Sequence, residues 1–256
     1  MSQIYIKARL QGHVGILELS NPGKYNALPQ AGWLSVRPKL NQLIGDGARA
    51  IIVKGDGDHF CAGADISEFD TVRKNAETAR IYEASNVEAF THLRNCQVPT
   101  IASIKGYCLG GGFGLAAACD LRVASLDAKF AVPAAKLGLG YPVEAMADIV
   151  GAIGSQNAKR MLYTADSFTT DTMLSMGFLI EAVPAEKVEE HSQLLADKIS
   201  NLAPLTHRAT KTTVAAIASG DWQHAKFHSD ATFESADYAE GRKAFKERRK
   251  AEFQGR

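Results

Sequence analysis

A run of glycines, Gly110–Gly114 (GGGFG), is the segment of this chain whose residue types point most directly to chemistry. It follows the apolar stretch Thr100–Ile104 and leads into the small-residue run Leu115–Cys119. A strand, a glycine turn and a helix in this order leave unpaired backbone N–H groups at the helix N-terminus, where they can hold an anion. Glycine permits the bent backbone and keeps side chains away from a ligand.

The spacing of these glycines argues against a site for nucleotide phosphates. The chain has no G-x-x-x-x-G-K-[ST] motif, and the glycines are not spaced as G-x-G-x-x-G. A hole for the negative oxygen that develops during acyl chemistry fits the pattern better. A flexible loop or a tight packing turn is the other interpretation of such a run.

A second glycine-containing segment, His59–Phe69, supports the same interpretation. It follows the apolar strand Ala50–Val53 and the turn Gly55–Gly57, and it opens towards a helix, as the first segment does. An oxyanion hole usually needs two backbone donors that converge from different loops. We therefore expect the two loops to form one site.

The elements that must position these loops alternate between strands and helices along most of the chain. Periodicity predicts strands at residues 4–10, Val14–Leu19, Ala50–Val53, Thr100–Ile104, Leu121–Ala124 and Lys129–Val132. It predicts helices at Pro29–Ile44, at Ala76–Arg94 and from the glycine run through Cys119, and mainly helix after Pro142. This order is typical of the α/β class. A continuously apolar strand such as Ala50–Val53 indicates burial on both faces.

Composition and charge exclude several classes of protein. The 256 residues are 46% hydrophobic and 22% charged, which is ordinary for a globular protein, and a net charge of +1 gives no general attraction to nucleic acid or membrane. The cysteines have no C-x-x-C or zinc-like spacing, so we expect buried, reduced thiols and no metal site. Because no signal-peptide core or membrane-spanning stretch is visible, we expect a cytoplasmic location.

Taken together, the motifs resemble those of the crotonase (enoyl-CoA hydratase/isomerase) superfamily, in the family's order and over nearly the whole chain. The segments that carry the resemblance are Asn21–Leu28 (NPGKYNAL), Phe60–Ile66 (FCAGADI), Gly106–Gly112 (GYCLGGG) with Ala118–Asp120, Lys129–Gly138, and Glu240–Arg249 (EGRKAFKERR). The resemblance implies a spiral of β-β-α units in residues 1–195. It implies a C-terminal helical oligomerisation region in residues 196–256, which in this family builds trimers that often pair as hexamers.

The resemblance also implies roles for individual positions. The backbone N–H groups of Ala64 and Gly111 would hold the thioester oxygen of an acyl-CoA. Coenzyme A would enter as part of the substrate, with no separate cofactor. Its expected path runs along Ala62, Asp65 and Ile66. Lysines that could contact its phosphates are Lys24, Lys246 and Lys250, although solvated surface charge is the alternative interpretation of each.

The sequence departs from the family pattern at two catalytic positions. The hydratases of this family carry two glutamates that handle a water molecule, and these positions are Gly114 and Ala134 here. Neither side chain can take or give a proton, so hydration by two glutamates is not expected. The isomerases that keep only the second glutamate are not matched either.

Glu144 is the best remaining acid–base candidate in the sequence. It follows Leu137–Pro142, a loop that in this family runs past the acyl end of the substrate. A charge that favours the first turn of a helix is the other interpretation of Glu144. Tyr141 and His59 could supply a hydroxyl and an imidazole, but each residue type more often has a structural role.

The sequence therefore predicts an enzyme that acts on an acyl-CoA or enoyl-CoA thioester through an enolate. Isomerisation, hydrolysis and lyase chemistry all stay open. A non-catalytic CoA-binding or scaffold protein that kept the pocket is the alternative. RNA binding through the basic segment Arg242–Glu252 is disfavoured, because glutamates interleave with its basic residues and no RNA-recognition motif is present.

Overall fold

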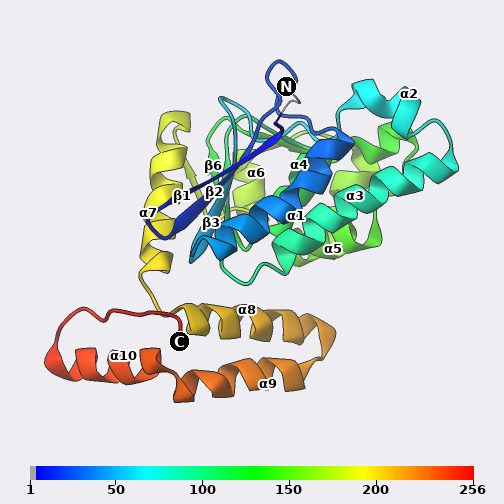
Figure 1. The fold of residues 1–256 in the computed structure, drawn as a ribbon. Coiled ribbons are helices and arrows are strands. Elements are labelled where there is room, and N and C mark those ends of the chain that lie inside the picture. The colour runs from blue at the N-terminus through cyan, green and yellow to red at the C-terminus, as the bar shows by residue number, and fades with distance from the viewer. Residues whose placement is uncertain (1–3) are drawn as a thin grey trace.

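The computed structural model describes residues 4–256, and it consists of an α/β body and a separate helical tail (Figure 1). A six-stranded sheet in the order β1-β2-β3-β4-β6-β9 forms the centre of the body. Its strands are β1 (Ile6–Gln11), β2 (Val14–Leu19), β3 (Ala50–Gly55), β4 (Thr100–Ile104), β6 (Leu121–Ser125) and β9 (Glu181–Val183). Only the β1–β2 pair is antiparallel.

Helices cover both faces of this sheet (Figure 1). Those of the body are α1 (Gln30–Gly45), α2 (Phe69–Val72), α3 (Ala76–Arg94), α4 (Gly111–Ala118), α5 (Val143–Thr164), α6 (Thr170–Ser175) and α7 (Val188–Ser200). Short 3-10 turns lie at Ile66–Glu68, Pro133–Leu137 and Ala185–Lys187. The covering explains the apolar strands, because a parallel sheet between two helical layers is buried on both sides.

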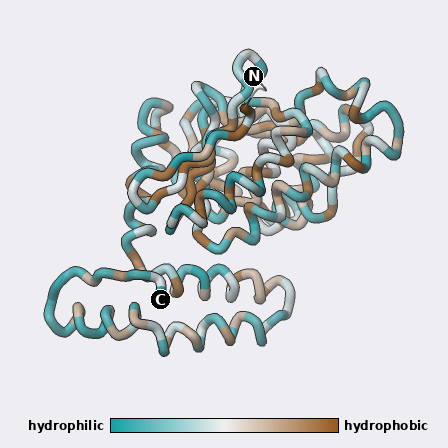
Figure 2. The backbone as a smooth tube through the Cα atoms, viewed as in Figure 1, coloured by the Kyte–Doolittle hydropathy of each residue, from teal (hydrophilic) through white to brown (hydrophobic). Residues whose placement is uncertain are grey.

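The alternation within β3 shows how the two faces differ. Ile51 and Val53 belong to the large core shared with α1, α3 and α4, whereas Ala50 and Ile52 belong to a smaller core beneath α7. The prediction that this strand is buried on both faces is confirmed. In Figure 2 the hydrophobic colour is concentrated along these inner strands and on the inward sides of the helices.

A second, three-stranded sheet was not predicted from the sequence. It contains β5 (Tyr107–Leu109), β7 (Lys129–Ala131) and β8 (Phe168–Thr169) in the order β5-β7-β8. β7 corresponds to the strand predicted at Lys129–Val132, but β5 and β8 are too short to show an apolar period. The sheet is important because β5 lies between Gly106 and the glycine run, so its pairing fixes where that run begins.

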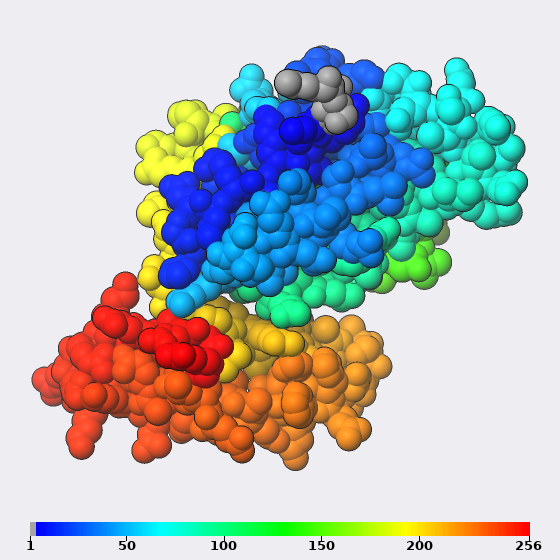
Figure 3. Space-filling view, in the orientation of Figure 1, coloured from blue at the N-terminus to red at the C-terminus, as the bar shows by residue number. Residues whose placement is uncertain are grey.

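The tail consists of α8 (Pro204–Ser219), α9 (Trp222–Ala231), a 3-10 turn at Thr232–Glu234 and α10 (Ala236–Glu247). In Figure 3 it forms its own lobe beside the body. The domain boundary predicted at residue 195 falls inside α7, whose residues Val188 and Ala196 are buried against the sheet. The body therefore continues to the end of α7, and the tail starts at the next helix. Within residues 4–256, no helix is both long and apolar enough to cross a membrane.

Predicted element bounds agree with the structure where the sequence signal is strong. β2, β4 and α3 have the bounds expected from periodicity. The N-terminal strand is less buried than its apolar alternation indicated, because β1 is an edge strand and Leu10 near its end is exposed.

Candidate active site

Backbone pairing brings the two glycine-containing loops together. The Cys61 N–H donates to the Tyr107 carbonyl at 2.9 Å, and the Leu109 N–H donates to the Cys61 carbonyl at 2.9 Å. The segment after β3 thus pairs with β5 through an isolated parallel bridge between Cys61 and Cys108. On its other side, the Leu28 N–H donates to the Gly63 carbonyl at 2.8 Å. The loop that carries Ala62, Ala64 and Ile66 is therefore held from both sides.

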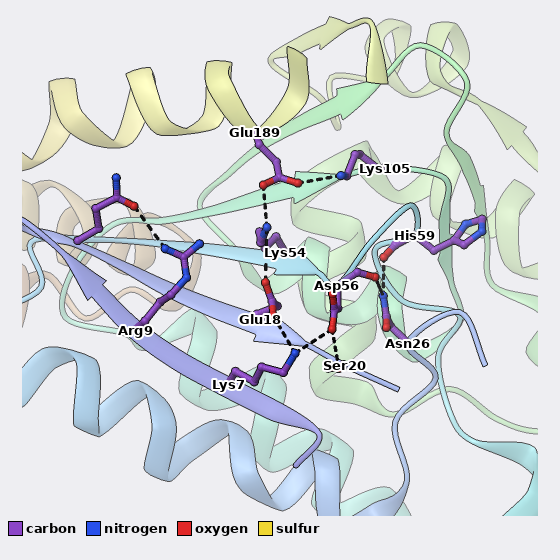
Figure 4. A network of polar contacts seen from close by, with 11 residues as sticks. Lys7, Arg9, Glu18, Ser20, Asn26, Lys54, Asp56, His59, Lys105 and Glu189 are labelled. Carbon is purple, nitrogen blue, oxygen red and sulfur yellow. Dashed lines mark hydrogen bonds and ion pairs between the residues drawn. The ribbon is translucent and has the colours of Figure 1, made fainter. Parts of the chain in front are cut away.

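Side chains from distant parts of the chain fix the start of this loop. Asn26 donates its amide N–H groups to the carbonyls of Asp56 and His59, at 2.9 and 2.7 Å. Asp56 in turn accepts from Ser20 and Lys7, both at 2.8 Å (Figure 4). A buried amide with several fixed partners orients backbone more tightly than packing alone.

The predicted oxyanion-hole donors, Ala64 and Gly111, lie on the two loops where they approach each other. Gly63 has φ +96°, and a β-carbon on it would lie 3.1 Å from the Gly111 nitrogen. Gly111 is the first residue of α4, so its N–H has no partner within the helix. In the part of the chain that the structure describes, neither the Ala64 N–H nor the Gly111 N–H donates a backbone or side-chain hydrogen bond.

Both residues line one cavity of about 130 Å³. Apolar side chains form most of its wall, and four residues with polar side chains, Arg73, Glu83, Asn86 and Tyr141, also line it. The apolar lining residues are Ala62, Ile66, Phe69, Phe90, Val132, Pro133, Ala134, Leu137, Leu139 and Pro142. A concave, mostly apolar site with a few convergent polar groups is typical of a ligand pocket.

The first missing glutamate position is closed by packing. A β-carbon at Gly114 would lie 2.8 Å from Phe90 Cζ and 2.9 Å from the Tyr141 hydroxyl. That hydroxyl donates to the Gly110 carbonyl at 3.0 Å, so Tyr141 holds the start of the glycine run. Burial raises the pKa of Tyr141 strongly, and it stays a neutral hydrogen-bond donor. The second position, Ala134, is buried on the cavity wall and carries no ionisable group.

The structure brings in a carboxylate that the sequence analysis missed. Glu83, in the middle of α3, lines the cavity together with Arg73 and Asn86. Arg73 Nη2 and Glu83 Oε1 form an ion pair with side-chain exposures of 12% and 21%. Nothing in the sequence near Glu83 marks it, because its place at the site depends on how α3 packs against α1 and α4. The available signal was weak, because Glu83 shares its helix face with Asn86 as well as Phe90, so polar and apolar residues are mixed there.

The remaining predicted residues are distributed differently from Ala64 and Gly111. Ala62 and Ile66 line the cavity, and Ile66 is largely exposed at its mouth. The Asp65 side chain instead accepts from the Ser67 N–H at 3.0 Å and from Lys24 Nζ at 2.7 Å. Lys24 is thus occupied by an intramolecular ion pair, with its amine beside the loop.

Glu144 is not brought to the cavity. Its side chain is exposed in the first turn of α5 and is not among the cavity-lining residues of the described chain. Its acid–base role stays a prediction that its position does not favour. His59 is likewise outside the cavity, where Nδ1 accepts from the Tyr107 N–H at 3.1 Å. Lys246 and Lys250 are exposed in the tail and its C-terminal extension.

All four cysteines are buried and free. Burial raises the pKa of Cys61 and of Cys119 to about 12. A thiol that stays protonated at neutral pH is a poor nucleophile. The cysteines bordering the site therefore act as core residues.

Comparison with known proteins agrees with this geometry. A family model described as enoyl-CoA hydratase/isomerase matches residues 9–256. The chain belongs to this family, within the crotonase superfamily. A crotonyl-CoA hydratase of Syntrophomonas wolfei is 30% identical over 246 residues, which is 94% of each chain. A mitochondrial Delta(3,5)-Delta(2,4)-dienoyl-CoA isomerase of Homo sapiens is 31% identical over 216 residues, covering 80% of this chain and 66% of the isomerase.

Solved structures show the same fold over the full chain. An enoyl-CoA hydratase/isomerase family protein from Hyphomonas neptunium superposes with a TM-score of 0.95 at 31% identity, covering 99% of this chain and 98% of that one. An enoyl-CoA hydratase/carnithine racemase from Magnetospirillum magneticum gives a TM-score of 0.94 at 29% identity, covering 100% and 97%. The relatives thus include proteins named for different reactions on one scaffold.

Proposed function

We propose that this protein is an enzyme that binds an acyl-CoA or enoyl-CoA thioester and stabilises its enolate with the backbone N–H groups of Ala64 and Gly111. The observation that carries the proposal is the pair of unpaired N–H groups on one cavity, in a chain of the enoyl-CoA hydratase/isomerase family. Negative charge collects on the thioester oxygen as the enolate forms. Preorganised donors therefore bind the transition state more tightly than the neutral substrate.

The shape and lining of the cavity support one placement of the substrate. The acyl group would occupy the apolar interior, and the pantetheine arm would leave past Ala62 and Ile66 at the mouth. At about 130 Å³ the cavity is smaller than the roughly 300–1,000 Å³ of drug-sized ligand pockets, which favours a short acyl group. We expect Lys24 to contact a CoA phosphate by exchanging its bonds to Asp65 and Ser67. No separate cofactor is part of the proposal.

The absent glutamates shape the reaction. Hydration by two carboxylates would need side chains at Gly114 and Ala134, and the Gly114 side is filled by Phe90 and Tyr141. We therefore favour isomerisation, hydrolysis or lyase chemistry over standard hydration.

We also expect the tail to assemble the chain into trimers or hexamers.

Deuterium exchange tests the proposal even while the product of the reaction is unidentified. The purified protein is incubated in D₂O with a panel of acyl- and enoyl-CoA esters that starts from short chains, and the masses of the esters are followed. Uptake of deuterium at the α-carbon indicates an enolate even when no net product forms. CoA-ester binding without exchange or turnover on the whole panel would favour the alternative of a non-catalytic CoA-binding or scaffold protein.

A matched pair of variants isolates the Gly111 N–H. Gly111→Ala and Gly111→Pro both place a β-carbon against the Trp33 ring, 2.8 Å from Cη2, but only proline removes the N–H. Proline is tolerated at the first position of a helix. We expect Gly111→Pro to lose a further 10²–10³-fold in exchange rate, roughly, relative to Gly111→Ala. Equal rates in the two variants would remove this donor from the mechanism.

A further inference from the structure

Glu83 is the one carboxylate that lines the cavity in the part of the chain that the structure describes. It lies three residues before Asn86 and seven before Phe90 on α3, so the three side chains share one face of the helix. Helix α3 packs beside α1 and α4, which fixes this face against the glycine run. The Glu83 carboxylate and the proposed oxyanion-hole donors, Ala64 and Gly111, therefore belong to residues that line the same cavity.

The partner of Glu83 is held rigidly. Arg73 follows α2, and its guanidinium carbon lies 4.5 Å from the ring centroids of both Phe69 and Tyr82. Tyr82 is itself fixed, because its hydroxyl accepts from Trp33 Nε1 at 3.0 Å. A guanidinium in cation–π contact with two aromatic rings has little freedom to turn away. The Glu83 carboxylate therefore has a defined position.

Two polar atoms beside Glu83 have unused bonding capacity. Arg73 Nε and Asn86 Oδ1 are buried and have no hydrogen-bond partner within residues 4–256, whereas Glu83 Oε1 is paired with Arg73 Nη2. Asn86 as a whole is only 5% exposed. Buried polar groups normally have partners, and an unsatisfied group that lines a cavity calls for an explanation such as a ligand or a catalytic role.

We propose that Glu83 is the catalytic acid–base residue that moves a proton on the acyl chain, and that Arg73 is the residue that positions its carboxylate. This inference rests on the proposed function, because the proton can leave carbon only if the enolate oxygen is stabilised. Glu83 would replace the two glutamates that the family pattern places at positions 114 and 134. It would approach the substrate from α3 rather than from α4 or from the 3-10 turn at Pro133–Leu137.

A single carboxylate suits a double-bond shift. A Glu83 oxygen takes a proton from a carbon of the enoyl chain, and the C–H electron pair moves into the conjugated enolate, whose oxygen the two N–H groups hold. The protonated Glu83 then returns the proton to a different carbon of the chain. The double bond has moved, no atom has been gained or lost, and the carboxylate is restored. We therefore infer that the substrate class is a short enoyl-CoA and that the reaction is its isomerisation.

The environment of Glu83 supports a carboxylate that is more basic than one in water. Burial raises the pKa of Glu83 above its usual range, and the charge of Arg73 opposes that rise and favours the carboxylate. Tyr141 also lines the cavity, and burial keeps its hydroxyl neutral. A carboxylate of increased basicity accepts a proton from carbon more readily than one in water.

The test uses Glu83→Gln in the D₂O experiment, with Glu77→Gln as the matched control. Glu77 lies on the same helix, but it is exposed and is not among the residues that line the cavity. We expect Glu83→Gln to lower deuterium exchange and isomerisation by about 10²-fold or more while CoA-ester binding, measured by calorimetry, is retained. Glu77→Gln should match the unmodified protein.

The outcomes separate the two proposals. Undiminished exchange in Glu83→Gln would overturn the assignment of Glu83 and leave the oxyanion hole standing. Absence of exchange in the unmodified protein with every ester would overturn both. Loss of exchange in Glu144→Gln but not in Glu83→Gln would transfer the role to Glu144.

Two further variants keep the proposal testable if Glu83→Gln fails to fold. Glu83→Asp keeps the carboxylate but withdraws it by one methylene, so exchange should be slower but present. Arg73→Gln removes the charge that favours the ionised form, so the acidic limb of the pH–rate profile should move up by about one unit or more. A purely structural role for Arg73 would leave that limb in place, and this result would overturn its assignment as a positioning residue.

Discussion

Gly114 has no side chain because two other residues occupy the space beside it. Phe90 Cζ and the Tyr141 hydroxyl would lie within 2.9 Å of a β-carbon there. The absence of a glutamate at position 114 and the presence of Tyr141 are thus linked, because the Tyr141 hydroxyl occupies the space that a side chain at position 114 would need. The hydroxyl that fills the gap also fixes the carbonyl of Gly110, the residue before the proposed donor.

We predict that Gly114→Ala destabilises the fold by about 1–3 kcal/mol, because the added methyl group overpacks the site. For a chain of this size each kcal/mol lowers the melting temperature by about 2–4 °C. Gly151→Ala is the matched control, since a β-carbon at this exposed position in α5 meets nothing within 4 Å. The control should be neutral or stabilising by about 0.5–1 kcal/mol. Equal melting temperatures in the two variants would contradict the packing explanation.

Residues were predictable from sequence where their role depends on backbone, and less so where it depends on packing. The two loops that carry Ala64 and Gly111 were predicted because glycine spacing and strand–turn–helix order are local signals, and the family resemblance implied the two positions within them. Glu83 was missed because its contact with Arg73 depends on the approach of α2 to α3. Glu144 was preferred because it is close in sequence to the expected acyl loop, yet its position in the first turn of α5 leaves it exposed.

At the scale of elements, long periodic segments were predicted well, whereas short ones were predicted only in part: β6 and β7 were expected, but β5 and β8 were not. The bounds of α3 follow from its apolar spacing and from the Asn75 cap, which accepts from the Thr78 N–H at 2.9 Å. β5 has only three residues, so its pairing with β7 and with Cys61 could not be foreseen. Because β5 sets the position of the glycine run, the site could be predicted as a pair of loops but not as a cavity.

The 3-10 turn at Ile66–Glu68 depends on Asp65, which accepts from the Ser67 N–H and pairs with Lys24. Burial raises the pKa of Asp65, but the bonds from Lys24 and Ser67 outweigh it and hold the pKa below its usual value. We predict that Asp65→Ala lowers the free energy of unfolding at pH 7 by about 1–2 kcal/mol, measured by urea titration. Asp70→Ala, exposed on the neighbouring α2, should change it by less than about 0.5 kcal/mol.

The pH dependence gives this prediction a sign. A carboxylate whose pKa is lower in the folded state stabilises the fold above its unfolded pKa of about 4, and this contribution is lost as the pH falls through the folded value. The difference between the unmodified protein and Asp65→Ala should therefore shrink below about pH 4. A difference that stayed constant down to pH 3 would indicate lost packing rather than a lost charge interaction.

At the scale of the whole molecule, the tail is attached to the body by a few polar contacts. Lys211 Nζ lies 2.7 Å from Asp120 Oδ2, and Arg49 donates to the Phe253 carbonyl at 2.9 Å. Within the tail, Asp237 accepts from the backbone N–H groups of Gln254 and Gly255, so the C-terminal segment is fixed to α10. The lobe visible in Figure 3 thus has polar contacts of its own and a few polar contacts to the body.

Large apolar side chains are exposed on the tail of the single chain, and we expect another subunit to cover them. Those more than 60% exposed include Val214, Ile217, Phe227, Phe233 and Phe245. Contiguous exposed apolar surface is unusual on a monomer and marks interaction sites. We predict that the chain sediments as a trimer or hexamer of its 27.5 kDa subunit, with the tail buried between subunits.

The variant that tests this assembly combines Phe227→Glu with Phe245→Glu. Both side chains are well exposed in the single chain, so the fold measured by circular dichroism should be preserved. Burying two carboxylates in a subunit interface is costly, and the sedimentation coefficient should fall to that of the monomer. The control is Lys226→Glu, which changes an exposed charge on α9 beside Phe227, and this variant should keep the oligomer. A monomeric unmodified protein at micromolar concentration, or an oligomer that survives the double substitution, would show that the exposed tail faces are not the assembly surface.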